Sequence, residues 1–226
     1  MKGLEFLLEG TEVEFVPKKL IMAGYTGRNQ EAVRIHVEEL KKLGVPAPKE
    51  VPTFFVVPVD RLSTEPLIEA LELTSSGEPE VVYFITGKDI WVGIGSDHTD
   101  REMEKTSIPY SKLVAPKPVS RKLWSYERLK DEWDSLILRS WVGGDGRERV
   151  YQEGRLEMLL RPEQLLEILA PKVSGDLEGA VIFGGTVPML GEELHFEGYF
   201  EAELMNPRTN ESLSCSYTTK ILNYLR

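Results

Sequence analysis

Two apolar runs flank the short polar turn Thr86-Gly87-Lys88-Asp89, and together they predict a β-hairpin over residues 78–97. With a two-residue loop, counting outward from the turn pairs each residue of one strand with a residue of the other and ends with Glu78 opposite Asp97. Because side chains alternate between the two faces of a strand, a shift by one residue would mix apolar and polar side chains. The alternation therefore predicts a single register, in which one face holds Val81, Tyr83, Ile85, Ile90, Val92 and Ile94.

The opposite face of the predicted hairpin ends in the carboxylates of Glu78, Glu80 and Asp97. Cross-strand neighbours lie about 5 Å apart at Cβ, and like charges at that distance favour binding of a proton or of a cation. Three acidic oxygen donors suit a hard divalent cation, so the spacing indicates a site for Mg²⁺ or Mn²⁺, with Ca²⁺ as a further candidate. An acidic hairpin end that is merely solvated accounts for the same pattern, and both interpretations stay open at this point.

Composition argues against several classes of partner. The chain has 226 residues and a formal net charge of -10, whereas nucleic acids and anionic membranes attract basic surfaces. The single cysteine, Cys215, rules out an internal disulfide and is typical of a reducing cytoplasm. Glutamates interrupt the apolar runs near the N-terminus, and no stretch of about 18 uncharged apolar residues occurs. We therefore expect a cytoplasmic protein without a signal peptide or a membrane-spanning helix.

Strands outnumber helices in the predicted elements. Helices are expected at residues 29–43, 125–133 and 162–169, where an apolar stripe, a following glycine or an opening proline gives the signal. The predicted strands and helices do not alternate regularly as βαβ units, and this order favours an α+β, mainly β fold. We expect residues 1–50 to form a small N-terminal β element with a lid-like helix, and residues 51–226 to form one compact domain. The predicted strands are residues 4–8, 12–16, 20–23, 53–60, 66–73, 136–142 and 179–188, the hairpin, and two strands at the end of the chain.

The helix predicted at residues 29–43 places His36 on its apolar stripe, between Val33 and Leu40. Glu39 follows three residues later and shares the neighbourhood of the imidazole. A histidine in the core with a helical ion-pair neighbour explains this spacing, and spacing alone favours that interpretation. The alternative is a dyad in which the Glu39 carboxylate orients His36 as a general base.

Two further cations follow the hairpin. The spacing of Thr99-Asp100-Arg101-Glu102 is that of a capping box, so a short helix carrying Arg101 should begin there. Lys112 comes next, ahead of the turn Pro116-Lys117-Pro118. None of the glycine-bearing turns has the spacing of a nucleotide-binding loop, and no serine or cysteine nucleophile motif is present.

In this order the motifs resemble those of the fumarylacetoacetate hydrolase superfamily, from about Gly27 to the C-terminus. The metal-binding E-x-E pair of that family corresponds to Glu78-Pro79-Glu80. The other matching segments are Gly27-Arg28-Asn29 with His36 and Glu39, Ser96-Asp97-His98-Thr99-Asp100-Arg101-Glu102, Lys112 ahead of Pro116-Lys117-Pro118, Gln152-Glu153-Gly154, and Gly185-Thr186-Val187-Pro188.

The resemblance implies a mixed β-sandwich roll that is usually a homodimer and binds Mg²⁺ or Mn²⁺, with residues 51–226 as the catalytic domain. It implies a metal-dependent hydrolase or lyase that cleaves a C–C bond of a small, anionic oxo- or diketo-carboxylic acid through a metal-stabilised enolate. An isomerase or tautomerase of the same substrate class and an inactive metal-binding module are the alternatives. The implied roles are metal binding for Glu78, Glu80 and Asp97, catalysis for His36, Glu39 and Lys112, and substrate binding for Arg101 and Thr186.

Overall fold

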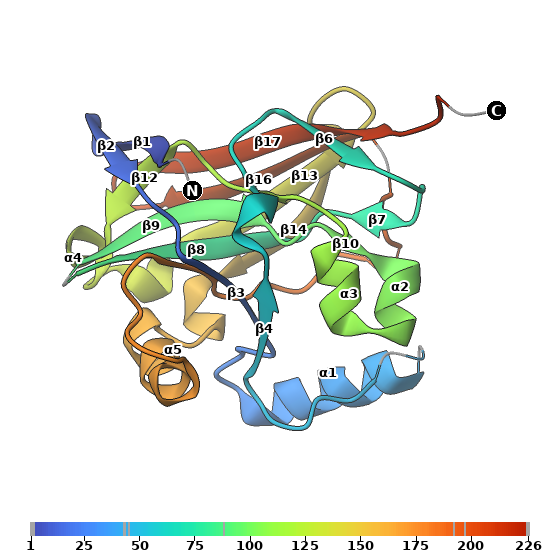
Figure 1. Ribbon diagram of the computed structural model, residues 1–226, viewed down its shortest axis with the longest axis horizontal. Coiled ribbons are helices and arrows are strands. Elements are labelled where there is room, and N and C mark those ends of the chain that lie inside the picture. The colour runs from blue at the N-terminus through green and yellow to red at the C-terminus, as the bar shows by residue number, and fades with distance from the viewer. Residues whose placement is uncertain are drawn as a thin grey trace.

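Two β-sheets form the body of the protein in the computed structural model (Figure 1), which describes residues 3–42, 44, 46–87, 89–191, 193–196 and 198–224. The larger sheet has eight strands, in the spatial order β2 (Thr11–Phe15), β1 (Leu4–Leu8), β12 (Lys122–Ser125), β9 (Asp89–Ser96), β8 (Pro79–Thr86), β15 (Ala180–Phe183), β3 (Lys19–Gly24) and β4 (Thr53–Val57). The smaller sheet has five strands, in the order β14 (Arg149–Arg155), β13 (Ile137–Gly143), β16 (Gly198–Asn206), β17 (Glu211–Ile221) and β6 (Leu67–Ala70).

Short elements complete the fold. Two small pairs join β10 (Thr99–Asp100) to β7 (Ser75–Ser76) and β11 (Lys117–Pro118) to β5 (Leu62–Ser63). The α-helices are α1 (Gln30–Lys42), α2 (Arg101–Thr106), α3 (Ile108–Leu113), α4 (Tyr126–Leu129) and α5 (Pro162–Leu169). Single 3₁₀ turns occur at Val59–Arg61, Trp133–Ser135, Leu156–Met158 and Ala170–Lys172. The predicted α+β, mainly β class is confirmed.

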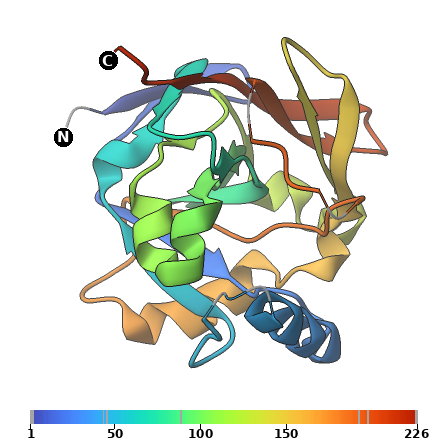
Figure 2. The same ribbon diagram turned by 90° about the vertical axis from the view of Figure 1, so that its right-hand side faces the viewer.

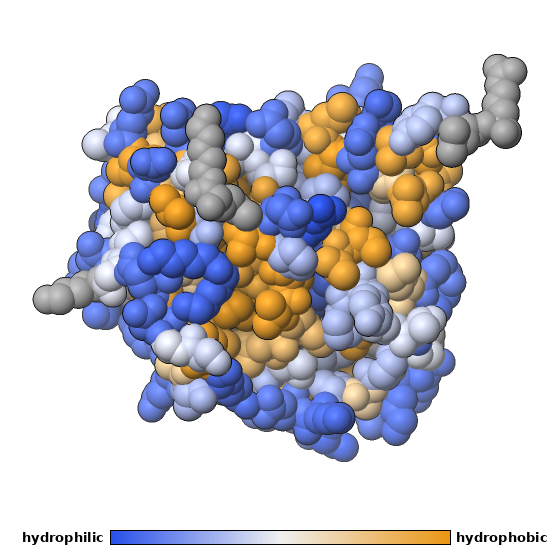
Figure 3. All heavy atoms as spheres, viewed as in Figure 1, coloured by the Kyte–Doolittle hydropathy of each residue, from blue (hydrophilic) through white to orange (hydrophobic). Residues whose placement is uncertain are grey.

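The helices lie around the sheets rather than between them. In Figures 1 and 2, α1 and α5 lie on one side of the molecule, and α2 and α3 form a compact pair above α1. Among the described residues, none of these helices is both long and apolar enough to cross a membrane. Figure 3 shows apolar side chains near the middle of the face seen in Figure 1, where β4 lies. Val56 of β4, an outer strand of the larger sheet, is 82% exposed.

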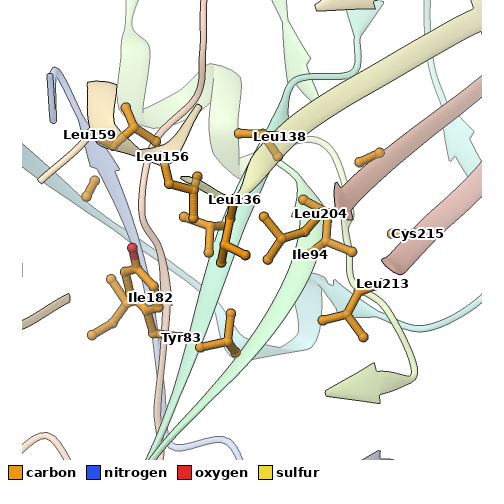
Figure 4. Packing of buried hydrophobic residues seen from close by; sticks show 14 of the residues in the cluster. Tyr83, Ile94, Leu136, Leu138, Leu156, Leu159, Ile182, Leu204, Leu213 and Cys215 are labelled. Atoms are coloured by element: carbon orange, nitrogen blue, oxygen red, sulfur yellow. The ribbon is translucent and has the colours of Figure 1, made fainter. Parts of the chain in front are cut away.

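The β8–β9 hairpin has the predicted register. Ile85 pairs with Ile90 and Val81 with Ile94, and beyond the strands the Asp97 N–H donates to the Glu78 carbonyl oxygen at 2.9 Å. The predicted apolar face packs against the five-stranded sheet, and Figure 4 shows Tyr83 and Ile94 of the hairpin among leucines of other elements. The turn residue Lys88 lies outside the described residues.

The other face of the larger sheet encloses a second apolar core. Phe6 of β1 and Phe84 of β8 have ring centroids 5.0 Å apart, although β12 and β9 lie between their strands in the sheet. In a flat sheet, three strand spacings would separate these rings by about 14 Å. The sheet therefore curls strongly, and the face that ends in the carboxylates is apolar along most of its length.

Strand β1 and helix α5 have the predicted bounds, whereas other predicted elements have changed ends. The segment 125–133 forms only α4, and the strand predicted at 53–60 ends at Val57 because a 3₁₀ turn follows. The short helix after Asp97 exists, but Asp100 is its N-cap: its carboxylate accepts from the N–H groups of Glu102 and Met103. The Thr99 hydroxyl donates instead to the Asp97 carbonyl oxygen at 2.9 Å. The sequence interpretation did not include α3, which carries Lys112.

The N-terminal strands are part of the main sheet. The hairpin β1–β2 pairs with β12, and β3 lies between β15 and β4. A division of the chain at residue 50 stays a prediction. The predicted helix end at Leu43 and the side chains of His36 and Leu40 lie outside the described residues.

Candidate metal centre and active site

Three carboxyl groups meet at the open end of the β8–β9 hairpin. Glu78 precedes β8, Glu80 lies within it, and Asp97 follows β9. One oxygen atom from each side chain lies within 4.8 Å of the other two. Glu80 and Asp97 are buried, whereas Glu78 is half-buried. The hairpin register brings the three together because Glu78 and Asp97 are opposite each other and Glu80 shares their face.

The two buried carboxyl groups differ in their protonation behaviour. Burial, together with the charges of Asp97 and Glu78, raises the pKa of Glu80 well above its usual value, although the Gly185 N–H donates to Glu80 Oε2 at 2.8 Å. Burial alone would also raise the pKa of Asp97, but the charges of Lys112 and Lys117 outweigh it and hold that pKa below its usual range. The cluster thus contains one carboxylate that is stabilised by cations and one that favours a proton.

Two lysines contact the same aspartate. Lys112 from α3 donates to Asp97 Oδ2, and Lys117 from β11 has its Nζ 3.1 Å from Asp97 Oδ1. Lys117 is fully buried and also donates to the His98 carbonyl oxygen at 2.5 Å. Burial and the charge of Lys112 lower the pKa of Lys117 to about 8 despite Asp97. Burial would lower the pKa of Lys112 too, but Asp97, Glu78, Glu104 and Glu80 together raise it.

Arg101, at the start of α2, lies directly against the cluster. Its guanidinium donates to Ser76 Oγ at 2.7 Å, to Glu104 Oε2 at 3.1 Å and to Glu78 Oε2 at 3.5 Å. Together with Glu104, the site holds four carboxyl groups and three cations. Such a concentration of charged groups with shifted pKa values marks a candidate functional site.

A hydrogen-bonded network supports the back of the site. The Glu78 N–H donates to Ser96 Oγ at 3.1 Å, and Ser96 Oγ lies 2.8 Å from the Tyr217 hydroxyl. That hydroxyl lies 2.9 Å from Nδ1 of His98, whose Nε2 is 2.9 Å from Ser75 Oγ. Burial lowers the pKa of His98 to about 3, so the ring is neutral. His98 points away from the carboxylates, in agreement with the strand alternation.

The remaining predicted site residues lie at different positions relative to the cluster. Thr186 follows Gly185, which bonds to Glu80, but the Thr186 hydroxyl accepts from Gln152 Nε2 at 3.0 Å. Glu39 lies on the exposed side of α1. The backbone of His36 lies in α1, and its side chain is outside the described residues. The structure therefore brings Arg101 and Lys112 to the carboxylates, and leaves the predicted dyad without a described geometry.

Sequence reasoning missed one residue of the site, Lys117, and the unusual backbone conformation of Tyr25. Lys117 was noted only as part of a proline turn. Tyr25, at the end of β3, has φ of +59°, a left-handed conformation that is uncommon for a residue with a side chain. Burial and the charge of Glu104 raise the pKa of its phenol. In the sequence, a lysine between two prolines is only a weak signal for a site residue. No sequence pattern indicates a positive φ at a tyrosine.

A cavity of about 670 Å³ lies between residues 46–50, β4 and the turn that joins α2 to α3. Its walls include Pro48, Lys49, Phe55 and Ile108. The Phe55 ring also faces the site, because Lys112 Nζ lies 5.7 Å from the ring centroid. The cavity is within the size range of small-molecule pockets.

The donor set fits a hard divalent cation. All three groups offer oxygen, two of them are buried, and their oxygens lie close enough to share one ion. Nitrogen or sulfur donors, which would favour zinc or copper, are not part of the described cluster.

Several solved structures have a fold similar to that of this chain. A fumarylpyruvate hydrolase from Pseudomonas aeruginosa, solved in complex with Mn²⁺ and pyruvate, is 16% identical with a TM-score of 0.66 over 98% of this chain and 97% of that chain. A yeast fumarylacetoacetate hydrolase family protein is 16% identical with a TM-score of 0.63, over 91% and 94% of the two chains. A 2-keto-3-deoxy-D-arabinonate dehydratase, complexed with magnesium and 2,5-dioxopentanoate, is 14% identical with a TM-score of 0.62, over 93% and 77%.

These likenesses confirm the predicted resemblance at the level of the fold. No curated protein matches the chain in sequence. The family model described as "Protein of unknown function (DUF2848)" matches residues 23–217. The chain therefore belongs to this family of unknown function, and it has the fold of the fumarylacetoacetate hydrolase superfamily.

Proposed function

We propose that this protein is a divalent-metal-dependent hydrolase or lyase that cleaves a C–C bond in a small oxo- or diketo-carboxylic acid. The observation that carries the proposal is the oxygen-only cluster of Glu80 and Asp97, both buried, and the half-buried Glu78, with cationic side chains beside it. Solved proteins of the same fold include one in complex with Mn²⁺ and pyruvate and one with magnesium and 2,5-dioxopentanoate.

Glu78, Glu80 and Asp97 are the groups that would hold Mg²⁺ or Mn²⁺. When bound, such an ion acts as a Lewis acid toward a carbonyl oxygen of the substrate and as a template for its orientation. Glu80 must give up its proton to serve as a ligand, because metal binding requires the deprotonated carboxylate.

The chain's own cations would bind the anionic substrate. Arg101 and Lys112 border the cluster, and an acidic protein needs such local positive charge to attract a carboxylate. Lys117, buried behind Asp97, holds that carboxylate in place. The cavity beside Phe55 is large enough to accept the remainder of a small carboxylic acid.

His36 and Glu39 stay the proposed general base and its orienting carboxylate, which together would activate water. Their helix, α1, runs below α2 and α3 in Figure 1 and leads to residues 46–50, which line the cavity. In this proposal α1 is the lid of the site. Thr186, next to the Glu80-binding Gly185, would hydrogen-bond the substrate after exchanging its contact with Gln152.

The test is turnover of oxo-acids by the purified protein, first stripped with a chelator and then supplied with Mg²⁺ or Mn²⁺. Oxaloacetate and a series of acylpyruvates are suitable substrates, with products followed by absorbance and NMR. We expect cleavage only after metal is restored. Rearrangement of an acid without cleavage would indicate the isomerase, and metal binding without any conversion would indicate the inactive module.

The assembly and the compartment are separate parts of the proposal. We propose a homodimer in the cytoplasm, by analogy with the resemblance and from the single cysteine. Light scattering of the purified protein tests the assembly, and a monomer at all concentrations would contradict it.

A further inference from the structure

Lys112 places its ammonium group against Asp97, one of the three carboxylates of the cluster. The side chain is 9% exposed and forms an ion pair with Asp97 Oδ2. Glu78, Glu104 and Glu80 also act on its charge. Lys112 is therefore one of three protein cations, with Lys117 and Arg101, that contact the candidate metal ligands.

Both oxygens of Asp97 are in use. Lys112 occupies Oδ2, whereas Oδ1 lies 3.1 Å from Lys117 Nζ and 3.3 Å from Thr99 Oγ1. A metal ion bound at Oδ2 would lie beside the Lys112 ammonium, and the repulsion between the two cations favours movement of Lys112 away from Asp97.

The two lysines differ in how easily they can be displaced from Asp97. Lys117 is fully buried on β11 and also holds the His98 carbonyl oxygen, so its displacement would leave a second buried group without its partner. Lys112 is on the short helix α3, and its Nζ lies 5.7 Å from the centroid of Phe55, which lines the adjacent cavity. The Phe55 ring offers a cation a favourable surface on the side of that cavity.

We propose that Lys112 is an exchangeable internal cation, which occupies the carboxylate cluster until a divalent metal ion displaces it toward Phe55 and the cavity. This inference rests on the proposed metal-dependent function. It gives Lys112 two positions: one that neutralises the ligands before the metal arrives, and one that faces the substrate afterwards.

Charge balance gives this exchange a consequence for substrate binding. Without metal, the carboxylates of Glu78, Asp97 and Glu104 balance the three cations Arg101, Lys112 and Lys117, because Glu80 favours a proton. A divalent ion adds two positive charges and Glu80 adds one negative charge when it gives up its proton, so the site then carries one positive charge. The site therefore attracts an anionic substrate only after metal has bound, which places metal before substrate in the order of binding.

The experiment measures Mn²⁺ affinity by calorimetry in the chelator-treated protein and in Lys112→Met. The control is Lys105→Met, because Lys105 on the neighbouring helix α2 pairs with Glu102 and is 48% exposed. Removing the competing charge should tighten Mn²⁺ binding about tenfold or more in Lys112→Met, since like charges a few ångströms apart repel strongly in a buried site. Lys105→Met should bind like the unmodified protein.

Each outcome separates this inference from the proposed function. Equal or weaker binding by Lys112→Met would overturn the inference and leave the metal-dependent function standing. Binding by Lys112→Met alone would support the inference while contradicting metal use by the natural protein. Failure of both proteins to bind Mn²⁺ would overturn both proposals.

A second measurement needs no variant and remains decisive if Lys112→Met does not fold. The natural protein is treated with an amine-acetylating reagent with and without Mg²⁺, and each lysine is followed by mass spectrometry. We expect Mg²⁺ to increase acetylation of Lys112 several-fold and to leave that of Lys105 unchanged. An unchanged rate at Lys112 would overturn the exchange.

Discussion

Asp97 and Asp134 each bind two cationic side chains, but in different surroundings. Asp97 has a side chain that is 1% exposed and is bound by two lysines. Asp134 is 41% exposed and is bound by two arginines: Arg28 donates to both of its oxygens, at 2.5 and 3.0 Å, and Arg161 donates at 3.3 Å. The same residue type therefore serves in a buried and in a half-exposed ion cluster.

The partners explain the difference in role. Arg28 is a planar fork that also donates to the Leu159 carbonyl oxygen at 2.5 Å, so it fixes the segment before α1 to the segment before α5. A lysine is a point charge on a flexible stem and can exchange its partner at lower cost. In the Asp134 cluster two arginines bind one carboxylate, and we interpret this cluster as structural. Asp97 differs because the carboxyl groups of Glu78 and Glu80 lie beside it.

The largest difference between the clusters should appear in Asp97→Asn. This variant should lose Mn²⁺ binding and reduce metal-dependent turnover more than about a hundredfold. It also leaves two buried lysines facing a neutral amide, which should lower the free energy of unfolding by about 3–5 kcal/mol. Calorimetry and urea unfolding measure the two effects, with Asp134→Asn as the matched control. Retained metal binding in Asp97→Asn would reject the site.

Glu80→Gln should have an intermediate effect, visible as a change in pH dependence. Because burial raises the pKa of Glu80 in the folded protein, its protonated form stabilises the fold at low pH, and this contribution is lost as pH rises through the raised pKa. A glutamine does not titrate, so the melting temperature of the metal-free variant should rise relative to that of the natural protein over the pH range above the usual glutamate pKa. The melting temperature should shift by about 2–4 °C for each kcal/mol of difference in the free energy of unfolding. Parallel melting curves across this range would contradict the electrostatic account of Glu80.

Asp134→Asn should have the smallest effect. Its pKa is lowered, first by the hydrogen bond from Arg28, so its contribution to stability is present at neutral pH and is lost as pH falls through that lowered value. Since the side chain is more than one-third exposed, solvent screening limits the cost to about 0.5–1 kcal/mol. Unfolding at pH 7 and at pH 3 measures the difference, which should shrink in acid. A change in Mn²⁺ affinity would show that the two clusters are coupled.

The part of the site within the hairpin could be predicted because its geometry is local. Alternation with period two gave the register, and the register alone brings Glu78, Glu80 and Asp97 to one face. Arg101 follows within a few residues, so its nearness to the cluster is also a local consequence. The same alternation turned His98 away from the carboxylates.

Contacts between distant segments supplied what the sequence did not reveal. Lys117 is buried beside Asp97 because β11 pairs with β5 and packs against β9. The close approach of β11 to β9 depends on Gly95, where a Cβ atom would lie 2.6 Å from the Pro118 carbonyl oxygen. The left-handed Tyr25 and the helix that carries Lys112 likewise depend on packing around them rather than on a local pattern.

Residue order therefore settled the strands, the hairpin register and the position of the acidic groups, since these follow from side-chain alternation over a few neighbours. The curl of the larger sheet, the partners of Asp97 and the cavity beside Phe55 arise from segments tens of residues apart. Their placement depends on which surfaces bury one another, and no periodicity along the chain encodes that choice.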